Sequence, residues 1–539
     1  MSLDTLPSLP LFLEAKKHAL ANPDKIAVID TTKAQQFTFA QLLSDAASLK
    51  KRILEELSLT SAGDLEERRV AFLVPNGYDY VVTQWAVWAA GGVCVPLCTS
   101  HPVKELLYTI SDSDPSLIII HPTFEKFTTP LREGAPASET VPSRLFMPLT
   151  PITQATPVPS QLPDFSPVYI PDRRALMIYT SGTTSNPKGC VTTHKTITFQ
   201  AQCLIQAWQY TPADTLIHVL PLHHIHGIIN GLVATLLAGA TVEMHPKFDP
   251  AMIWSRWIDQ GTSTMFFAVP TIYARLVDYF ETSIRGSENE TAARQGANKL
   301  RLLVSGSAAL PTPIKTKFAS ITGQTLLERY GMTEIGMGLS CGLDTAQRID
   351  GSVGWPLPGV SVRLTSKETG SVIPEHDVET DGMIEVKGDN VFSEYWRRPE
   401  ATAKEFTSDG WFKTGDVARR NSEGAYFIQG RASVDIIKSG GYKISALEVE
   451  RKLLALEEVQ EVAVVGINDE EWGQRVAAVV KQREGTAPLE LQSLRANLKQ
   501  EMAPYKIPTV LKIVDGIERN AMGKVNKKTV VQKYWPELA

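Results

Sequence analysis

Short apolar runs alternate with amphipathic stretches between Asp24 and about Ile120, and this alternation constrains the fold more than any other feature of the sequence. Runs such as VAFLV (70–74) and LIII (117–120) predict buried strands, and residues 78–90 between them predict a helix. Strands that are joined through helices pair in parallel, with the helices covering the faces of the sheet. We therefore expect an α/β protein with parallel layers.

The length of the chain and a change in composition and residue pattern toward its C-terminus predict two domains. A chain of 539 residues is too long for one hydrophobic core. After Asp416 the sequence is punctuated by glycine and then shows a small α/β pattern. We predict a large N-terminal domain of α/β layers over residues 1–430 and a small, mobile α/β domain over residues 431–539. Two polar insertions, at 130–172 and 285–298, are expected to form a surface excursion and a loop.

The bulk properties argue against several classes of protein. The net charge of −5 and the lack of a Lys/Arg tract speak against a nucleic-acid partner. No uninterrupted apolar run is long enough to span a bilayer, and the N-terminus lacks the pattern of a secretory signal. Five sparse cysteines fit a reducing compartment. We expect a cytoplasmic location, with the mitochondrion as the alternative, and the oligomeric state stays open.

Two groups of potential metal ligands are interpreted otherwise. Cys94 and Cys98 lie four residues apart with no further ligand at a suitable spacing, so we expect buried thiols. The histidines of HHIH (223, 224 and 226) have no nearby cysteine or acidic residue, which argues against a metal centre there.

The sharpest local motif is YTSGTTSNPKG, residues 179–189, which follows a strand-like stretch. Its hydroxyl residues and glycines leave backbone N–H groups and hydroxyls free to surround phosphate oxygens, and Lys188 adds a positive charge. It is not a Walker A loop, because Gly-x4-Gly-Lys-[Ser/Thr] does not occur in it. Taken alone, the segment is equally well interpreted as a Ser/Thr-rich loop without function.

Five further motifs follow the loop in a fixed order. They are LPLHHIHG (220–227), ERYGMTE (328–334), GWFKTGD (410–416), GRASVDIIKSGGYK (430–443) and RNAMGKV (519–525). In content and order the six resemble the adenylate-forming superfamily of acyl-CoA synthetases, luciferases and peptide-synthetase adenylation domains, over nearly the whole chain. The resemblance implies a ligase that uses ATP and Mg²⁺ to form an acyl-adenylate from a small carboxylic acid and then passes the acyl group to coenzyme A.

The resemblance also assigns the ATP contacts. The phosphate loop would supply Thr180, Ser181, Gly182, Thr183, Thr184 and Lys188. The adenine would be contacted or flanked by Ser305, Gly306, Ser307, Ala308, Glu328, Tyr330 and Gly331. Thr333 would contact phosphate, Glu334 would bind Mg²⁺, and Asp416 with Arg431 would hold the ribose. The expected catalytic residues are Lys524, Thr184 and Glu334.

Two C-terminal segments would serve the two half-reactions. By resemblance, Lys524 bridges the acyl carboxylate and the α-phosphate during adenylation. The small domain would then rotate about a hinge at Ser433, although the family usually has Asp or Lys there. The pantetheine tunnel of coenzyme A would be lined by Ser439, Gly440, Gly441, Tyr442 and Lys443.

The amino-acid sequence of several segments, VPTIYARL (269–276) among them, resembles one branch of the superfamily, the malonyl-CoA synthetases. His224 would shape the floor of the acyl pocket, and Arg275 and Arg329 would pair with a second carboxylate on the substrate. A fatty acid would gain nothing from a buried guanidinium. Malonate is the expected acid, and methylmalonate, one methyl group larger, is not separated from it by sequence.

Three alternatives stay open. A medium-chain or aromatic acyl-CoA synthetase would direct these arginines elsewhere. A stand-alone adenylation enzyme would acylate a carrier protein instead of free coenzyme A. A non-catalytic nucleotide- or acyl-binding protein would need neither Glu334 nor Lys524.

Overall fold

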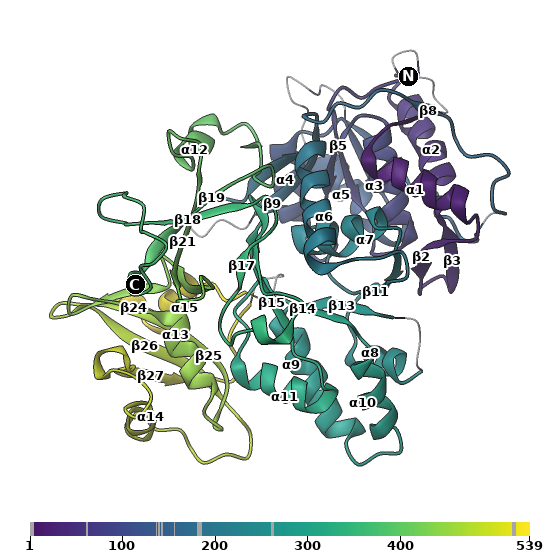
Figure 1. The fold of residues 1–539 in the computed structure, drawn as a ribbon. Helices are drawn as coiled ribbons and strands as arrows, with labels where there is room; N and C mark the ends of the chain where they lie inside the picture. Colours follow the sequence, from purple (N-terminus) through teal and green to yellow (C-terminus); the bar gives the residue numbers. More distant parts are fainter. Residues whose placement is uncertain are drawn as a thin grey trace.

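Two large sheets and the helices around them form most of the chain in the computed structural model (Figure 1). The structure describes residues 5–60, 63–135, 137, 141, 144–155, 157–180, 186–259, 263–519 and 524–538. The first sheet has seven strands, of which β9, β5, β4, β6 and β7 run parallel. In spatial order they are β20 (Glu394–Tyr395), β10 (Lys188–Thr193), β9 (Arg174–Thr180), β5 (Val93–Pro96), β4 (Arg69–Leu73), β6 (Leu117–Ile120) and β7 (Leu145–Pro148).

The second sheet has nine strands, with a parallel centre and antiparallel edges. In spatial order they are β17 (Trp355–Pro356), β16 (Gly336–Ser340), β15 (Leu327–Met332), β14 (Leu302–Ser305), β13 (Met265–Ala268), β11 (Thr215–His218), β12 (Thr241–Met244), β2 (Ile26–Asp30) and β3 (Gln35–Thr38). A small parallel pair, β1 (Leu6–Pro7) and β8 (Phe165–Ser166), lies apart from both sheets.

Helices pack between and outside these sheets. Every residue of α3 (Tyr78–Ala89) is buried, because this helix contacts β5 of one sheet and β2 of the other. With α3, the helices that pack into the largest core are α1 (Pro10–Ala21), α2 (Phe39–Glu56), α6 (His194–Trp208) and α7 (Ala234–Leu237). A second core lies under α8 (Pro250–Ile258), α9 (Pro270–Tyr279), α10 (Glu290–Asn298) and α11 (Thr312–Thr322). A third holds α4 (Val103–Ser113) and α5 (Thr128–Gly134) against the seven-stranded sheet.

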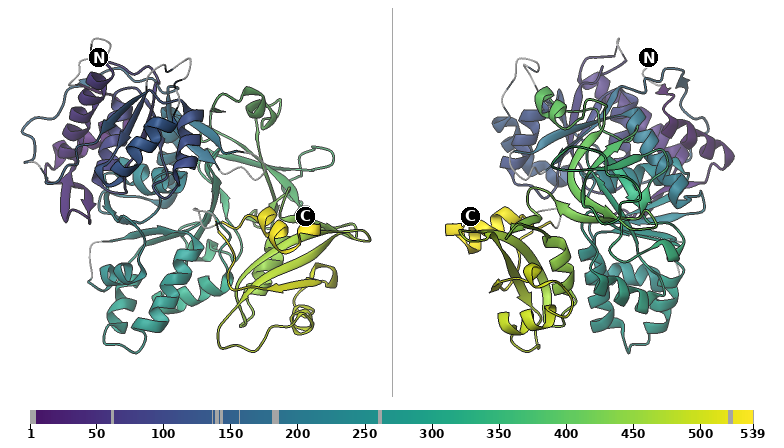
Figure 2. Two further views of the ribbon diagram at one scale, coloured as in Figure 1. Left: turned by 180° about the vertical axis from the view of Figure 1, so that it is seen from behind. Right: turned by 60° about the vertical axis from the view of Figure 1, so that its left-hand side comes forward.

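The C-terminal part contains two smaller sheets. A four-stranded sheet consists of β18 (Ser361–Thr365), β19 (Gly382–Lys387), β21 (Phe412–Arg420) and β22 (Tyr426–Arg431), with α12 (Pro399–Lys404) nearby. The last sheet consists of β24 (Tyr442–Ser445), β23 (Ile436–Ser439), β26 (Gly473–Gln482), β25 (Val459–Asp469) and β27 (Val510–Ile513). Its two faces pack on separate cores with α13 (Ala446–Leu454) and α14 (Leu491–Leu498) on one side and α15 (Lys527–Tyr534) on the other. Figure 2 shows this sheet and its helices as a separate lobe beside the rest of the chain.

The expected α/β class with parallel layers is confirmed, and the strands expected at 70–74 and 117–120 are β4 and β6. The prediction of a loop at 285–298 is wrong for its second part, because α10 begins at Glu290 and buries Ala293 and Ala297. The excursion at 130–172 contributes β7 to the seven-stranded sheet. The domain boundary stays a prediction; it falls where β22 leaves the four-stranded sheet and the chain enters the last one. Within the described ranges, no helix combines the length and apolarity needed to cross a membrane.

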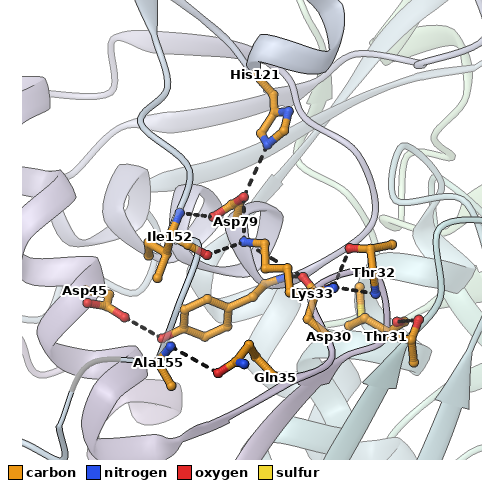
Figure 3. Close-up of polar contacts among 12 residues, drawn as sticks. Asp30, Thr31, Thr32, Lys33, Gln35, Asp45, Asp79, His121, Ile152 and Ala155 are labelled. Carbon is orange, nitrogen blue, oxygen red and sulfur yellow. Dashed lines mark hydrogen bonds and ion pairs between the residues drawn. The ribbon is translucent and has the colours of Figure 1, made fainter.

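A buried polar network joins loops of the two large sheets (Figure 3). The Asp79 carboxylate on α3 accepts hydrogen bonds from Lys33 Nζ at 2.7 Å and from the amide of Ile152 at 3.0 Å, and lies 3.2 Å from His121 Nε2. Asp30 at the end of β2 accepts from the amide of Tyr78 at 2.8 Å. Burial by itself raises the pKa of Asp79, but the hydrogen bonds from His121 and Lys33 outweigh it and hold the pKa below its usual value.

We expect Asp79→Ala to lower the free energy of unfolding by about 3 kcal/mol at pH 7, because it removes the carboxylate closest to the buried Lys33 ammonium. A depressed pKa means that this contribution is present at neutral pH and is lost as the pH falls below about 4, through the folded-state pKa. Equilibrium urea unfolding followed by tryptophan fluorescence measures both effects.

Asp389→Ala is the matched control. It breaks the ion pair to Lys195 at 2.9 Å, in which both side chains are half exposed, and should leave the free energy of unfolding nearly unchanged. Equal losses in the two variants at pH 7 would show that the buried network contributes no more than a surface pair.

Candidate active site

Several motifs of the sequence meet at Asp416, in the middle of β21. Tyr330 Oη on β15 donates to Asp416 Oδ2 at 2.5 Å, and Arg431 Nε on β22 lies 3.0 Å from Asp416 Oδ1. Asp416 and Arg431 are register partners on adjacent strands. Burial raises the pKa of Asp416, whereas the charge of Arg431 and the hydrogen bond from Tyr330 act against it. Asp416 is buried, and each of its carboxylate oxygens therefore has a donor beside it.

The Glu334 carboxylate lies in the same region. Tyr395 Oη donates to its Oε1 at 2.8 Å, and Lys188 Nζ lies 4.0 Å from the centre of the Tyr395 ring. Burial raises the pKa of Glu334, while the Tyr395 hydroxyl and the cations Arg431 and Lys188 oppose the rise. A buried carboxylate with one oxygen held by a hydroxyl is a hard, oriented ligand that fits Mg²⁺.

The phosphate motif lies between two paired strands. Thr180 ends β9 and is the register partner of Lys188, which begins β10, so the motif connects two antiparallel strands. Its central residues, Ser181, Gly182, Thr183 and Thr184, lie outside the described residues. Thr333 and Gly331 belong to the β15–β16 hairpin, and a side chain at Gly331 would meet the Gly336 carbonyl oxygen at 2.1 Å.

Lys524 lies among charges of both signs. The residue keeps exposed surface, yet partial burial of its ammonium group lowers its pKa. Arg431 and Arg329 lower that pKa further, while Asp416 and Glu334 raise it. The loop before it, residues 520–523, lies outside the described residues. The last segment of the chain thus brings its lysine to the carboxylates that come from β21 and the β15–β16 hairpin.

Arg329 is buried beside the end of β14. Its side chain is 3% exposed and lies so close to Gly306 that a Cβ there would meet the guanidinium at 2.5 Å. Its Nη2 donates to Ser307 Oγ at 3.0 Å, and its Nε has no hydrogen-bond partner in the described part of the chain. Burial lowers the pKa of Arg329 to about 9. Ser307 has a φ of 70°, a backbone conformation that a serine rarely adopts.

Two histidines of the HHIH motif lie near Ser307 and Arg329. His226 Nδ1 lies 3.5 Å from Ser307 Oγ, and the Nε2 atoms of His224 and His226 are buried without a partner among the described residues. Burial lowers the pKa of both imidazoles well below the usual value, and for His226 the neighbouring Arg329 adds to the effect. Both rings are therefore neutral at pH 7. Their orphan nitrogens and Arg329 Nε are polar atoms that a bound anion could satisfy.

Some predicted residues are not brought to this cluster. Glu328 pairs with Lys315 Nζ at 3.1 Å, because neighbouring side chains on a strand point to opposite faces and Arg329 takes the other one. Burial raises the pKa of Glu328 to about 7. Arg275 lies on the exposed surface of α9, with its guanidinium 4.9 Å from the centre of the Phe248 ring.

Others occupy turns and strand ends. Ser305 ends β14 with its hydroxyl buried, and Ala308 is exposed beyond it. Ser433 is exposed in the turn from β22 to β23. The turn Ser439–Gly440–Gly441–Tyr442–Lys443 joins β23 and β24, and its Lys443 pairs with Glu368. This turn contacts the loop after β18 in this arrangement, so the structure does not place it with Asp416 and Glu334.

Sequence reasoning missed three residues beside the site. Tyr395 and His226 have no distinguishing spacing, although His226 belongs to the HHIH motif. Cys98, expected to be an ordinary buried thiol, has Ser100 Oγ 3.2 Å from its sulfur. Burial raises its pKa, but hydrogen bonds with His101 and His223 outweigh this and bring the pKa to about 5. The histidine three residues after Cys98 was the available signal.

We expect iodoacetamide to label Cys98 before the other cysteines, at a rate nearly constant from pH 6 to pH 8, because its thiolate is already formed there. Burial raises the pKa of Cys94, Cys190, Cys203 and Cys341, so these thiols stay protonated. Peptide mass spectrometry after short exposures measures the rates.

Cys98→Ser should abolish the early label, and His101→Ala should restore a pH-dependent rate. A rate at Cys98 that rises about tenfold per pH unit over this range would contradict the lowered pKa.

Residues 15–396 match the family described as AMP-binding enzyme, and residues 448–524 match the AMP-binding enzyme C-terminal domain. The chain is 42% identical to malonate–CoA ligase ACSF3, mitochondrial, of Homo sapiens, over 98% of this chain and 92% of that protein. It is 39% identical to a malonate–CoA ligase of Arabidopsis thaliana, over 96% of this chain and 88% of that protein.

Among solved structures, ATP-bound MatB from Rhodopseudomonas palustris has a TM-score of 0.84 and 31% identity, with 100% of each chain covered. The likeness therefore extends over the whole fold, including the small C-terminal sheet. Because the family match spans most of the chain and these relatives cover nearly all of it, the protein belongs to the AMP-binding enzyme family and is an acid–thiol ligase with the adenylate-forming fold.

Proposed function

We propose that the protein joins malonate to coenzyme A, converting malonate, ATP and coenzyme A to malonyl-CoA, AMP and pyrophosphate, with methylmalonate as a second substrate. The observation that carries the choice of acid is Arg329. This guanidinium is 3% exposed and has no carboxylate partner among the described residues. A buried, unpaired cation is costly unless the ligand neutralises it. A substrate with a second carboxylate does so, and a fatty acid does not.

The surroundings of Arg329 suit a small anion. Ser307 Oγ and the neutral imidazole of His226 lie beside the guanidinium and add polar contacts without adding charge. His224 lies next to His223, with ring centres 4.0 Å apart, and would close the acyl pocket on the side of Lys524. A short diacid would span from this polar end to Lys524, whereas a long alkyl chain would meet buried polar atoms.

Arg275 is the weaker of the two predicted anchors. It is exposed on α9 and stacks over Phe248, so keeping its charge in water costs little without a substrate carboxylate. Its role in binding the acid stays a prediction, and substitution of each arginine separates their contributions.

For the adenylation step, we propose that the charges around Asp416 hold ATP and acid together. Asp416 would accept the ribose hydroxyls beside Arg431, with the Tyr330 ring next to the base. Lys188 and the phosphate motif would hold the β- and γ-phosphates. Lys524 would lie between the acid carboxylate and the α-phosphate, where the attack brings two anions together. Glu334 would hold Mg²⁺, which supplies neutralisation of the phosphate charge when bound.

Transfer to coenzyme A would use another arrangement of the C-terminal lobe. The glycine turn at 439–443 lies against Glu368 rather than at the adenylation cluster. Rotation about the turn that contains Ser433 would exchange Lys524 for these glycines. The cytoplasmic location stays a prediction, and the names of the vertebrate relatives support the mitochondrial alternative for this chain.

We expect malonate to give the highest kcat/KM for pyrophosphate release among malonate, methylmalonate, acetate and octanoate, with ATP, Mg²⁺ and coenzyme A present. Arg329→Met should lower kcat/KM for malonate by about 100-fold and leave acetate nearly unchanged, because loss of one partner of a buried charge pair costs about 3 kcal/mol. A coupled pyrophosphate assay measures both.

Arg275→Met is the matched control, and a smaller malonate-specific loss is expected for it. Octanoate turnover above malonate turnover in the wild type would overturn the choice of acid. Equal losses for malonate and acetate in Arg329→Met would make Arg329 a structural residue. Acylation of a phosphopantetheine carrier protein, with no response to free coenzyme A, would favour the stand-alone adenylation enzyme.

A further inference from the structure

A buried ion triad lies three residues beyond Lys524, at the first residue of α15. Lys527 Nζ is 2.5 Å from Asp435 Oδ1 and 2.8 Å from Glu450 Oε1, and all three side chains are at most 15% exposed. Asp435 lies just before β23, and Glu450 lies on α13. Three separate segments of the C-terminal lobe are thus tied at one ammonium group.

Asp435 also reaches across the predicted hinge. Its Oδ2 accepts a hydrogen bond from the amide of Arg431 at 2.9 Å, and its own amide donates to the Arg431 carbonyl at 2.8 Å. A side chain at Gly430 would meet Asp435 Cβ at 2.4 Å, so the carboxylate is packed closely on the end of β22. Ser433 lies between the two residues.

These contacts form a continuous path from Asp416 to the start of α15. Arg431 pairs with Asp416 through its side chain and with Asp435 through its backbone. Asp435 in turn pairs with Lys527, and α15 begins there with Asn526 as its N-cap, whose Oδ1 accepts from the amide of Lys528 at 3.1 Å. The start of α15 is therefore fixed within the lobe. Only Val525 and Asn526 separate it from Lys524, so its position limits where Lys524 can lie.

We propose that Lys527 and Asp435 are positioning residues that hold Lys524 at the reacting groups during adenylation. The inference rests on the proposed function, because it assigns them to the step in which Lys524 acts. Glu450 also accepts a hydrogen bond from the amide of Val464 at 2.8 Å, which anchors the triad to β25. The Asp435–Lys527 pair lies within the lobe and is kept when the lobe rotates. The Asp435–Arg431 bonds cross Ser433 and are broken by that rotation.

The two half-reactions should therefore respond differently. Lys527→Met should lower the rate of pyrophosphate release from ATP and malonate, without coenzyme A, by about 100-fold in kcat, because a displacement of about 1 Å in a reacting group costs that much. Consumption of chemically prepared malonyl-adenylate by coenzyme A should fall by less than about threefold, because Lys524 has left the site in that step. Asp435→Asn should show the same split.

Controls separate positioning from folding. Lys527→Arg keeps a cation between the two carboxylates and should recover most of the adenylation rate. Lys528→Met changes the exposed neighbour on α15, and Lys452→Met breaks an exposed ion pair of the same lobe, to Glu501 at 3.0 Å. Both should retain wild-type rates. The double variant Lys527→Met/Asp435→Asn should be no slower in adenylation than Lys527→Met alone.

Equal loss of both half-reactions in Lys527→Met, or no loss in either, would overturn the proposal. A fall in thermal stability with adenylation intact would also overturn it, since the triad would then be structural only. Absence of pyrophosphate release in the wild type with every acid would instead be a failure of the proposed function. The two failures are thus distinguished by the wild-type control.

Discussion

The buried carboxylate of Asp416 connects the parts of the molecule on which the site depends. Tyr330 reaches it from the nine-stranded sheet, and Arg431 reaches it from the neighbouring strand of the four-stranded sheet. Both oxygens of a buried carboxylate must be satisfied, and removing either partner leaves one of the two oxygens without its donor. The end of β22, where the chain turns toward the last sheet, is therefore held at the site by the same interaction.

Charges of both signs lie around Lys524. Two cations and two carboxylates surround it, and they come from β15, the β15–β16 hairpin, β21 and β22. Groups that are already oriented stabilise developing charge without reorganisation. Within the described residues, Asp416 and Arg431 balance one another, whereas Arg329 has the Ser307 hydroxyl and the neutral His226 imidazole beside it and no carboxylate in an ion pair with it. That imbalance is the physical basis for selecting an acid with a second negative group.

Patterns of local sequence predicted much of the fold. The strands and helices between Asp24 and Ile120 follow from apolar periodicity, which acts within each segment. The polar stretch at 285–298 was wrongly predicted to be a loop throughout. The buried face of α10 consists of Ala293, Gly296 and Ala297, and such small residues give a weak apolar periodicity. Among the site residues, Glu328 and Arg329 are neighbours in one motif, yet the alternation of the strand sends them to opposite faces.

The sequence by itself determined the class of fold, the motifs in their order and the types of residue that the chemistry requires, because these depend on composition and spacing along the chain. Only the tertiary structure decided which of two candidate arginines is buried, that Cys98 meets His223 from a distant loop, and that Lys527 pairs with both Asp435 and Glu450. Burial and partnership between residues far apart in sequence arise from packing of separate segments. No local pattern contains that information.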